Sequence, residues 1–283
     1  MEKGETRMGD KVEGNNPAKW ADILKKWGSL GDFVILCAVF SVLRPDVFPT
    51  LGNLRNIVDQ AATLAIAAAA VTMVMATGDF DLSVGAVASL AGVVAVKVMT
   101  ASQSVTLGIA AGCATGLAAG AFNGALVAYG NLSAFVATLA TMTGIGGLSL
   151  LVTGGATLFA GIPECFRVIG QGGIGPVPVA VVVMAAVVAL VWTAMERTVF
   201  GRKLYAIGGN MEATRLAGVD VRLVRLGGFA VSGLGASLAG IVLTSRLFSA
   251  HPQAGNPLML NAAAAVFLGA TAFREGEPHV GGT

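Results

Sequence analysis

The feature that most constrains this chain is a nearly uncharged stretch of 107 residues, from Ile57 to Pro163. It contains four charged residues, Asp59, Asp79, Asp81 and Lys97, whereas about a quarter of the residues in a soluble domain are charged. A water-exposed surface cannot be built from such a stretch. The mean hydropathy of the whole chain, +0.77, also excludes a disordered protein. The sequence therefore predicts a polytopic membrane protein.

The apolar segments predict an all-α polytopic transmembrane helix bundle with about eight spans, because a helix needs about 20 apolar residues to cross a bilayer. The first, third and eighth segments are shorter than the others. The predicted spans lie near Ser29–Leu43, Ile57–Ala76, Leu82–Val98, Val105–Tyr129, Leu132–Thr153, Val177–Met195, Leu223–Leu247 and Leu258–Ala272.

Lysines and arginines orient the spans, because cytoplasmic segments carry an excess of these residues. With the N-terminus inside, 13 of the 18 basic residues fall on the cytoplasmic side and five on the other. We therefore expect three parts: a polar cytoplasmic segment over residues 1–26, a transmembrane domain over residues 27–283, and within it a basic cytoplasmic loop over residues 196–222.

The fourth predicted span carries a glycine at every fourth position, and we call this set the glycine stripe. In lipid, a row of small residues lets another helix approach closely. The stripe therefore predicts helix packing rather than a substrate site, and it predicts that this span lies in the middle of the bundle. Its members are Gly108, Gly112, Gly116, Gly120 and Gly124.

A polar, glycine-containing segment, Thr77–Asp81, separates the second and third predicted spans. Irregular backbone at membrane depth persists only where protein or a watery cavity surrounds it. Two interpretations are open. One is a tight cytoplasmic turn in which Asp81 caps the next helix. The other is an interrupted helix facing a translocation path, with Asp79, Asp81 and Ser83 as candidate path residues.

The fourth and fifth spans carry uncharged polar side chains, of which Asn123, Thr138 and Thr141 are candidate substrate-path residues. Hydroxyls and amides without charge suit a neutral polyol such as a sugar. The same groups also serve as hydrogen-bonding links between transmembrane helices.

The basic loop contains its own start and stop signals. Gly208 and Gly209 are predicted to break the chain, and Asn210 to cap a short helix, Glu212–Ala217, that ends at Gly218. Such a basic, partly apolar helix on the inner face either binds anionic lipid headgroups or docks a soluble partner.

Motifs for catalysis and cofactor binding are absent from the sequence. It has no P-loop for ATP and no nucleophile elbow. Its three cysteines and two histidines have no metal-ligand spacing. A net charge of +2 is too small to indicate nucleic-acid binding. We therefore expect a transport protein that is not an enzyme and that binds no metal or cofactor.

Two stretches resemble the permease subunits of sugar ABC importers of the ribose, xylose, arabinose and galactose type. They are Gly78–Ala86, GDFDLSVGA, and Phe200–Val219, FGRKLYAIGGNMEATRLAGV. Supporting similarity lies in Phe122–Gly124 and in Ala137–Met142, and the resemblance covers roughly residues 45–283 in order.

The resemblance implies a subunit of the bacterial inner membrane that forms the path for a monosaccharide or related polyol. It implies four kinds of partner: a second permease subunit, a cytoplasmic ABC ATPase that uses the ATP, an extracytoplasmic sugar-binding protein, and membrane lipid. By position, the loop that couples to the ATPase is implied at Gly208, Gly209, Asn210, Glu212, Arg215 and Gly218.

The sequence departs from the family pattern in two respects. Family members commonly have Gly-Gly-Ile-Asp where this chain has Gly78-Asp79-Phe80-Asp81, so this chain carries an additional carboxylate. Relatives also have two further spans after the eighth, so we expect the transmembrane domain to be incomplete at its C-terminal end.

Two other transport functions are alternatives. An ion-coupled secondary transporter needs ionisable residues within the membrane, and Asp32, Asp59, Asp79 and Asp81 are those available. A branched-chain amino-acid ABC permease would need fixed charges or helix ends in the path to receive a zwitterion.

Overall fold

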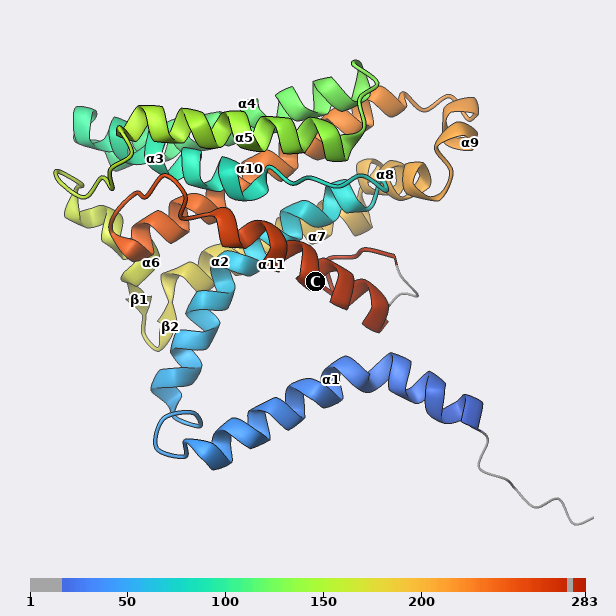
Figure 1. Cartoon of the computed structure of the whole chain (residues 1–283), viewed down its shortest axis with the longest axis horizontal. Helices are drawn as coiled ribbons and strands as arrows, with labels where there is room; N and C mark the ends of the chain where they lie inside the picture. The colour runs from blue at the N-terminus through green and yellow to red at the C-terminus, as the bar shows by residue number, and fades with distance from the viewer. Residues whose placement is uncertain (1–16, 274–276) are drawn as a thin grey trace, which may run out of the picture.

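The computed structural model describes residues 17–273 and 277–283 and shows an all-α bundle, as predicted (Figure 1). The long helices are α1 (Pro17–Leu43), α2 (Leu51–Met75), α3 (Val84–Ser102), α4 (Val105–Ala128), α5 (Ala134–Thr153), α7 (Val179–Arg197), α10 (Val221–Leu247) and α11 (Asn256–Phe273). The short elements are the 3-10 helix η1 (Glu164–Phe166), α6 (Arg167–Gln171), α8 (Val199–Gly209), α9 (Met211–Leu216), and the antiparallel pair β1 (Gly173–Ile174) and β2 (Val177–Pro178).

Six of the described helices are long and apolar enough to span a membrane, namely α2, α3, α4, α5, α7 and α10. The first and eighth predicted spans correspond to shorter apolar helices, Gly31–Leu43 within α1 and Asn256–Thr271 within α11. Six full-length spans and two short apolar helices therefore stand where eight spans were predicted. Of the predicted polar segment, residues 1–16 lie outside the described part, and α1 begins at Pro17.

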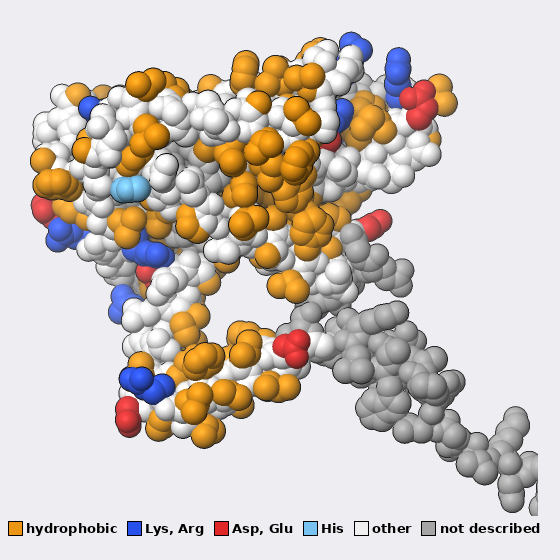
Figure 2. All heavy atoms as spheres, viewed as in Figure 1, with side chains coloured by type: hydrophobic (Ala, Val, Ile, Leu, Met, Phe, Trp, Pro, Cys, Tyr) orange, Lys and Arg blue, Asp and Glu red, His pale blue; other side chains and the backbone are white. Residues whose placement is uncertain are grey.

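Apolar and charged side chains occupy different parts of the molecular surface. On the face shown in Figure 2, hydrophobic side chains cover the centre of the bundle, while acidic and basic side chains gather toward its two ends. The end that carries α8 and α9 contains the basic segment predicted to be cytoplasmic, including Arg202, Arg215 and Arg222. This distribution is typical of a protein with a central belt facing lipid.

The centre of the bundle is formed by α2, α3 and α10. Buried residues make up 61% to 72% of the most apolar part of these helices, but only 22% in α4, α5 and α7. The prediction that the glycine-stripe helix lies in the middle is therefore wrong. Glycines mark one closely packed face of α4, whereas Leu107, Leu117 and Phe122 on its other faces are exposed.

The packing role predicted for the glycine stripe is confirmed. All five of its glycines are buried, and they face α3 and α10. A Cβ atom on Gly120 would lie 3.0 Å from the Cα of Gly233, and one on Gly124 would lie 2.8 Å from the Cα of Leu226. The backbones of α4 and α10 approach so closely that no side chain fits between them.

Two segments of irregular backbone enter the bundle from opposite ends. Residues 76–83, which we call the first interruption, turn at Gly78 with a positive φ of 79° and run back inward before α3 begins. Residues 248–255, the second interruption, pair with Leu158 through Ala250 at the other end and then lead to α11.

The two interruptions meet inside the bundle, where α3 and α11 begin side by side. A Cβ atom on Gly85 would lie 2.7 Å from the carbonyl oxygen of Gly255 and 3.1 Å from the Cα of Asn256. The Gly255 N–H donates to Ser89 Oγ at 2.9 Å, and this hydroxyl donates to the Gly85 carbonyl at 3.0 Å. Residues 79–83 are thus part of an interrupted helix pair rather than a turn on the surface.

The close contact between α4 and α10 makes a specific prediction for Gly116. A Leu side chain there would overlap the backbone of Gly233 and the side chain of Ser237. We expect Gly116→Leu to destabilise the bundle by about 3 kcal/mol, the cost of severe overpacking. The measurement is the yield and melting temperature of monodisperse protein extracted from membranes.

The matched control is Gly144→Leu in α5, because a Cβ atom on Gly144 would meet nothing within 4 Å. We expect this control to keep the wild-type yield. Wild-type yield and melting temperature for Gly116→Leu would contradict the packing assignment.

Candidate functional site

The first interruption is held by a buried network of polar side chains. Asp81 Oδ1 accepts hydrogen bonds from the Ser83 N–H at 2.9 Å and from Ser83 Oγ at 2.6 Å. Asn123 Nδ2 of α4 donates to Ser83 Oγ at 2.7 Å. Ser232 Oγ of α10 lies 3.5 Å from Asp81 Oδ2. These four residues are buried, so the network fixes the chain inside the protein.

Of the two open interpretations, the one in which Asp81 caps the following helix is not supported. The residue that precedes α3 is Ser83, and its side chain makes no capping hydrogen bond. Asp81 instead bonds to Ser83, two residues ahead, before the helix begins. The carboxylate therefore shapes the irregular backbone before α3 and does not satisfy the free N–H groups of the helix.

Thr138 of α5 satisfies the backbone of the same interruption. Its hydroxyl accepts a hydrogen bond from the Leu82 N–H at 3.1 Å and donates to the Ala134 carbonyl at 2.7 Å. Thr141, also predicted as a path residue, lies one turn further along and donates to the Thr138 carbonyl at 3.1 Å. The structure therefore brings together Asp81, Ser83 and Thr138, with Thr141 beside them.

Asp79 forms an ion pair with Arg225 near the start of α10. Arg225 Nε lies 2.8 Å from Asp79 Oδ2, and Arg225 Nη2 lies 2.6 Å from Asp79 Oδ1. Thr77 Oγ1 donates to Asp79 Oδ2 at 3.0 Å. The two charged side chains are only 10% and 15% exposed. This two-point contact ties the first interruption to α10.

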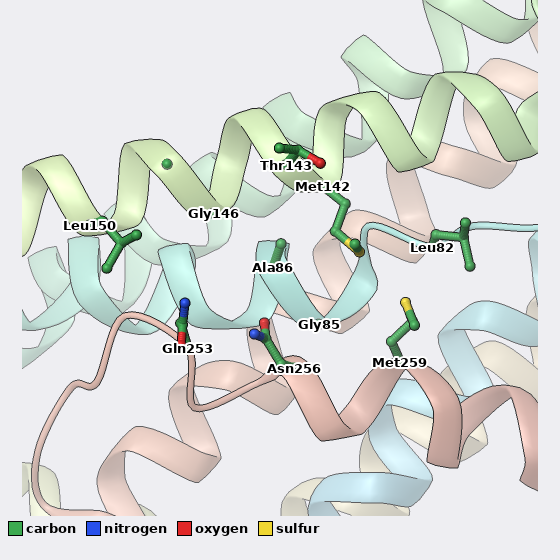
Figure 3. A pocket seen from close by; sticks show the side chains of 11 residues that line it. Leu82, Gly85, Ala86, Met142, Thr143, Gly146, Leu150, Gln253, Asn256 and Met259 are labelled. Carbon is green, nitrogen blue, oxygen red and sulfur yellow. The ribbon is translucent and has the colours of Figure 1, made fainter. Parts of the chain in front are cut away.

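A cavity of about 470 Å³ lies where the two interruptions meet α5 (Figure 3). Figure 3 shows α5 on one side, the start of α3 on another, and the start of α11 opposite. Among the described residues, no lining side chain is ionisable. The lining consists of Leu82, Gly85, Ala86, Met142, Thr143, Gly146, Gly147, Leu150, Gln253, Asn256 and Met259.

The cavity lining and the predicted path residues are neighbours but different sets. Leu82 lies between Asp81 and Ser83, and Thr143 lies two residues after Thr141. Asp81, Ser83 and Thr138 support the wall from behind, and side chains next to them face the cavity. Asp79 instead lines a separate cavity beside α8. Whether the predicted residues also touch a substrate stays a prediction.

Sequence reasoning missed Gln253 and Asn256, which supply two of the three polar side chains in the cavity. A signal for them exists in the sequence. Residues 252–257 read PQAGNP, a polar segment with glycine and proline directly before the eighth span, as Thr77–Asp81 stands before the third. Treating the two segments alike would have predicted a second interruption.

The predicted coupling loop forms two short helices. Asn210 caps α9 as predicted, its Oδ1 accepting from the Ala213 N–H at 2.9 Å, and Gly218 follows the helix with a φ of 84°. The predicted chain break at Gly208 is wrong, because α8 continues through Gly208 and Gly209. Gly208 is needed inside the helix, since any side chain there would overlap the carbonyl of Ala76.

The outer face of α9 is exposed and combines opposite charges with an apolar residue. Glu212 and Arg215 are exposed, and Leu216, the last residue of α9, is 81% exposed. Thr214 is buried, and its Oγ1 donates to the Ala206 carbonyl of α8 at 2.8 Å, which holds α9 against α8. The short helix thus has one fixed face and one face available to a partner.

Comparisons with known proteins identify the family. Residues 53–279 match the family described as branched-chain amino acid transport system / permease component. The ribose import permease protein RbsC of Escherichia coli (strain K12) is 39% identical over 258 residues, covering 90% of this chain and 80% of the relative. RbsC of Bacillus subtilis (strain 168) is 36% identical over 262 residues, covering 92% and 81%.

A third relative is the D-allose transport system permease protein AlsC of Escherichia coli (strain K12). It is 31% identical over 276 residues, covering 97% of this chain and 84% of the relative. No solved structure matches the chain. The chain belongs to this family of importer permeases, and the multi-pass membrane protein predicted from the sequence is confirmed.

The ion pair between Asp79 and Arg225 makes a stability prediction. Arg225→Met leaves a buried carboxylate without its partner, and such a loss costs about 3 to 5 kcal/mol. Replacing both residues, as in Asp79→Leu with Arg225→Met, removes both charges and should recover most of that loss. The measurement is the melting temperature of the purified protein.

An exposed ion pair serves as the control. Arg167 and Glu164 lie 3.6 Å apart with side chains 47% and 76% exposed, so Glu164→Gln should cost less than about 1 kcal/mol. A double variant that melts as low as Arg225→Met alone would show that the pair is not the source of the effect.

Proposed function

We propose that this member of the importer permease family forms the translocation path for a neutral monosaccharide or related polyol, with the energy supplied by ATP hydrolysis in a partner subunit. The observation that carries the proposal is the cavity between α3, α5 and α11. Its polar groups are a hydroxyl and two amides, and its remaining lining is apolar. Hydroxyls and amides both donate and accept, which matches the hydroxyl groups of a sugar.

The curated relatives support the same substrate class. The relatives at 36% to 39% identity are ribose import permeases, and a relative at 31% is a D-allose permease. Another, from Azospirillum brasilense, is an L-arabinose ABC transporter permease that is 30% identical over 262 residues. The uncharged cavity and these relatives together favour a neutral sugar.

The features of the site disfavour the two alternatives. An ion-coupled transporter would need an accessible carboxylate in the path. Asp79 is paired with Arg225 and Asp81 is bonded to Ser83, while Asp32 and Asp59 do not line the cavity. A zwitterionic amino acid would need fixed charges, and none of the cavity-lining side chains is ionisable. The family description names branched-chain amino acids, so leucine uptake belongs in any test of the substrate.

We place the N-terminus and the α8–α9 segment on the cytoplasmic side, because the basic residues concentrate there. On this side the exposed face of α9 is the docking surface for the ATPase, with Gly208, Gly209, Asn210 and Gly218 shaping it and Glu212 and Arg215 contacting the partner. A second permease subunit and an extracytoplasmic sugar-binding protein complete the importer. No nucleic acid, metal or cofactor takes part.

The structure supports a direct mechanical link from α9 to the site. Thr214 joins α9 to α8, Gly208 of α8 lies against the carbonyl of Ala76, and Ala76 opens the first interruption. Arg225, which follows the α9 segment in the chain, binds Asp79 in the same interruption. Movement of α9 on ATP binding would therefore reach the wall of the cavity through two contacts.

The function is tested by uptake into proteoliposomes that contain the permease with the ATPase and binding protein of its importer. We expect ATP supplied on the side of the membrane that carries the ATPase to drive uptake of D-ribose, D-allose or L-arabinose. We expect no uptake of leucine. Uptake of leucine, or sugar uptake driven by an ion gradient without ATP, would contradict the proposal.

The docking surface is tested by charge reversal. Glu212→Arg and Arg215→Glu should each weaken association with the ATPase by about tenfold, because like charges across an interface repel. Membrane insertion should be unchanged, since both side chains are exposed. The measurement is the amount of ATPase that co-purifies with the tagged permease.

Glu164→Arg provides the matched control, because Glu164 is an exposed acidic residue in a segment at the other end of the bundle. It should leave co-purification at the wild-type level. Wild-type ATPase recovery with both α9 variants would exclude α9 as the docking surface.

A further inference from the structure

We infer that the side-chain amides of Gln253 and Asn256 form the substrate-selecting element of the cavity, binding the hydroxyl groups of the passing sugar. This inference rests on the proposed function and names two residues that the sequence did not single out. Both belong to the segment that leads into α11, and both line the cavity from one side. Figure 3 shows the two amide groups directed toward α5 and the start of α3.

The first argument is that both amides are free to bind a ligand. In residues 17–273 and 277–283, neither side chain forms a hydrogen bond with the protein, and both residues are exposed. Two other amides that lie between helices are engaged: Asn123 Nδ2 donates to Ser83 Oγ, and Gln171 Nε2 donates to the Arg246 carbonyl at 2.8 Å. The two cavity amides therefore keep their full donor and acceptor capacity.

The second argument is that their backbone is held in place although the side chains are free. Asn256 N–H donates to the Gln253 carbonyl at 3.2 Å, which fixes the two residues relative to each other. The buried bond from the Gly255 N–H to Ser89 Oγ ties the segment between them to α3. Gly85 and Gly255 approach so closely that the segment has no room to move toward α3. The backbone therefore fixes where the two amides lie, and their unbonded groups remain available to the hydroxyl groups of a ligand.

The third argument concerns the rest of the lining. Leu82, Leu150, Met142 and Met259 offer apolar surface, and Thr143 offers the one other polar side chain. A sugar presents apolar C–H faces and a rim of hydroxyl groups. In this cavity the C–H faces would lie against the methionines and leucines, and the hydroxyl rim would face the amides.

A site with hydrogen-bonding groups discriminates against molecules that lack the matching group, because unpaired polar groups are left behind. Selection by the permease would add to the selection made by the binding protein. The two contributions can be separated, because the same binding protein is used with every permease variant. Its contribution to selectivity is therefore constant and cancels when variants are compared.

The test uses the complete importer in proteoliposomes with Asn256→Leu and Gln253→Met. Each substitution keeps the approximate size of the side chain and removes the amide. The matched control is Gln103→Met, because Gln103 is an exposed glutamine that donates to the Thr100 carbonyl at the end of α3, away from the cavity. Uptake of D-ribose and of 2-deoxy-D-ribose is measured for each variant, together with the ATPase rate.

We expect each cavity variant to reduce D-ribose uptake about tenfold, the effect of one lost hydrogen bond of about 1.4 kcal/mol. For at least one variant, 2-deoxy-D-ribose uptake should fall less than D-ribose uptake, so that the ratio of the two changes. The control variant should change neither sugar by more than about twofold. The restoring variant Asn256→Gln should recover part of the D-ribose uptake.

Two results overturn the inference. One is wild-type D-ribose uptake in both cavity variants. The other is an equal loss for both sugars in both variants, which would indicate a structural role without selection. Failure of the proposed function is different, because the wild-type importer itself would then transport neither sugar.

Discussion

The structure depends on the satisfaction of backbone hydrogen bonds in the first interruption, residues 76–83. Non-helical backbone inside a membrane protein leaves N–H and C=O groups that lipid cannot satisfy. Asp81 binds the Ser83 N–H, Thr138 binds the Leu82 N–H, and Asn123 holds Ser83 from α4. With these groups in place, α3 starts deep in the bundle beside α11. The cavity exists because both helices begin there.

The close packing of α4 on α10 positions the donors for this network. Gly116, Gly120 and Gly124 remove the side chains that would hold α4 away from α10. Asn123 is adjacent to Gly124 and can therefore reach Ser83. On the other side, the pair between Asp79 and Arg225 connects the interruption to the start of α10. Helix packing, the polar network and the cavity are thus successive consequences of the same small residues and short polar side chains.

The sequence predicted the parts of the structure that depend on local pattern. The helical class, most span positions, the close-packed face of α4 and the Asn210 cap follow from composition, spacing and single-residue geometry. It did not predict the peripheral place of α4, because a glycine stripe identifies a packed face and not the number of neighbours around a helix. The partner of Asp79 is 146 residues away in the chain, and no local pattern predicts that Arg225 is this partner. The polar segment that contains Gln253 and Asn256 could have been predicted as a second interruption, but its place beside α5 could not, because only folding brings it there.

The central claim is that the cavity between α3, α5 and α11 belongs to the translocation path. The most direct measurement is thiol labelling of Thr143→Cys in a permease without Cys37, Cys113 and Cys165, reconstituted with its ATPase and binding protein. Thr193→Cys on α7, outside the cavity lining, is the reference position. We predict that a membrane-impermeant reagent reaches position 143 from opposite sides with and without ATP, and that D-ribose slows the reaction there but not at position 193. A labelling rate at position 143 that changes neither with ATP nor with D-ribose would contradict the account.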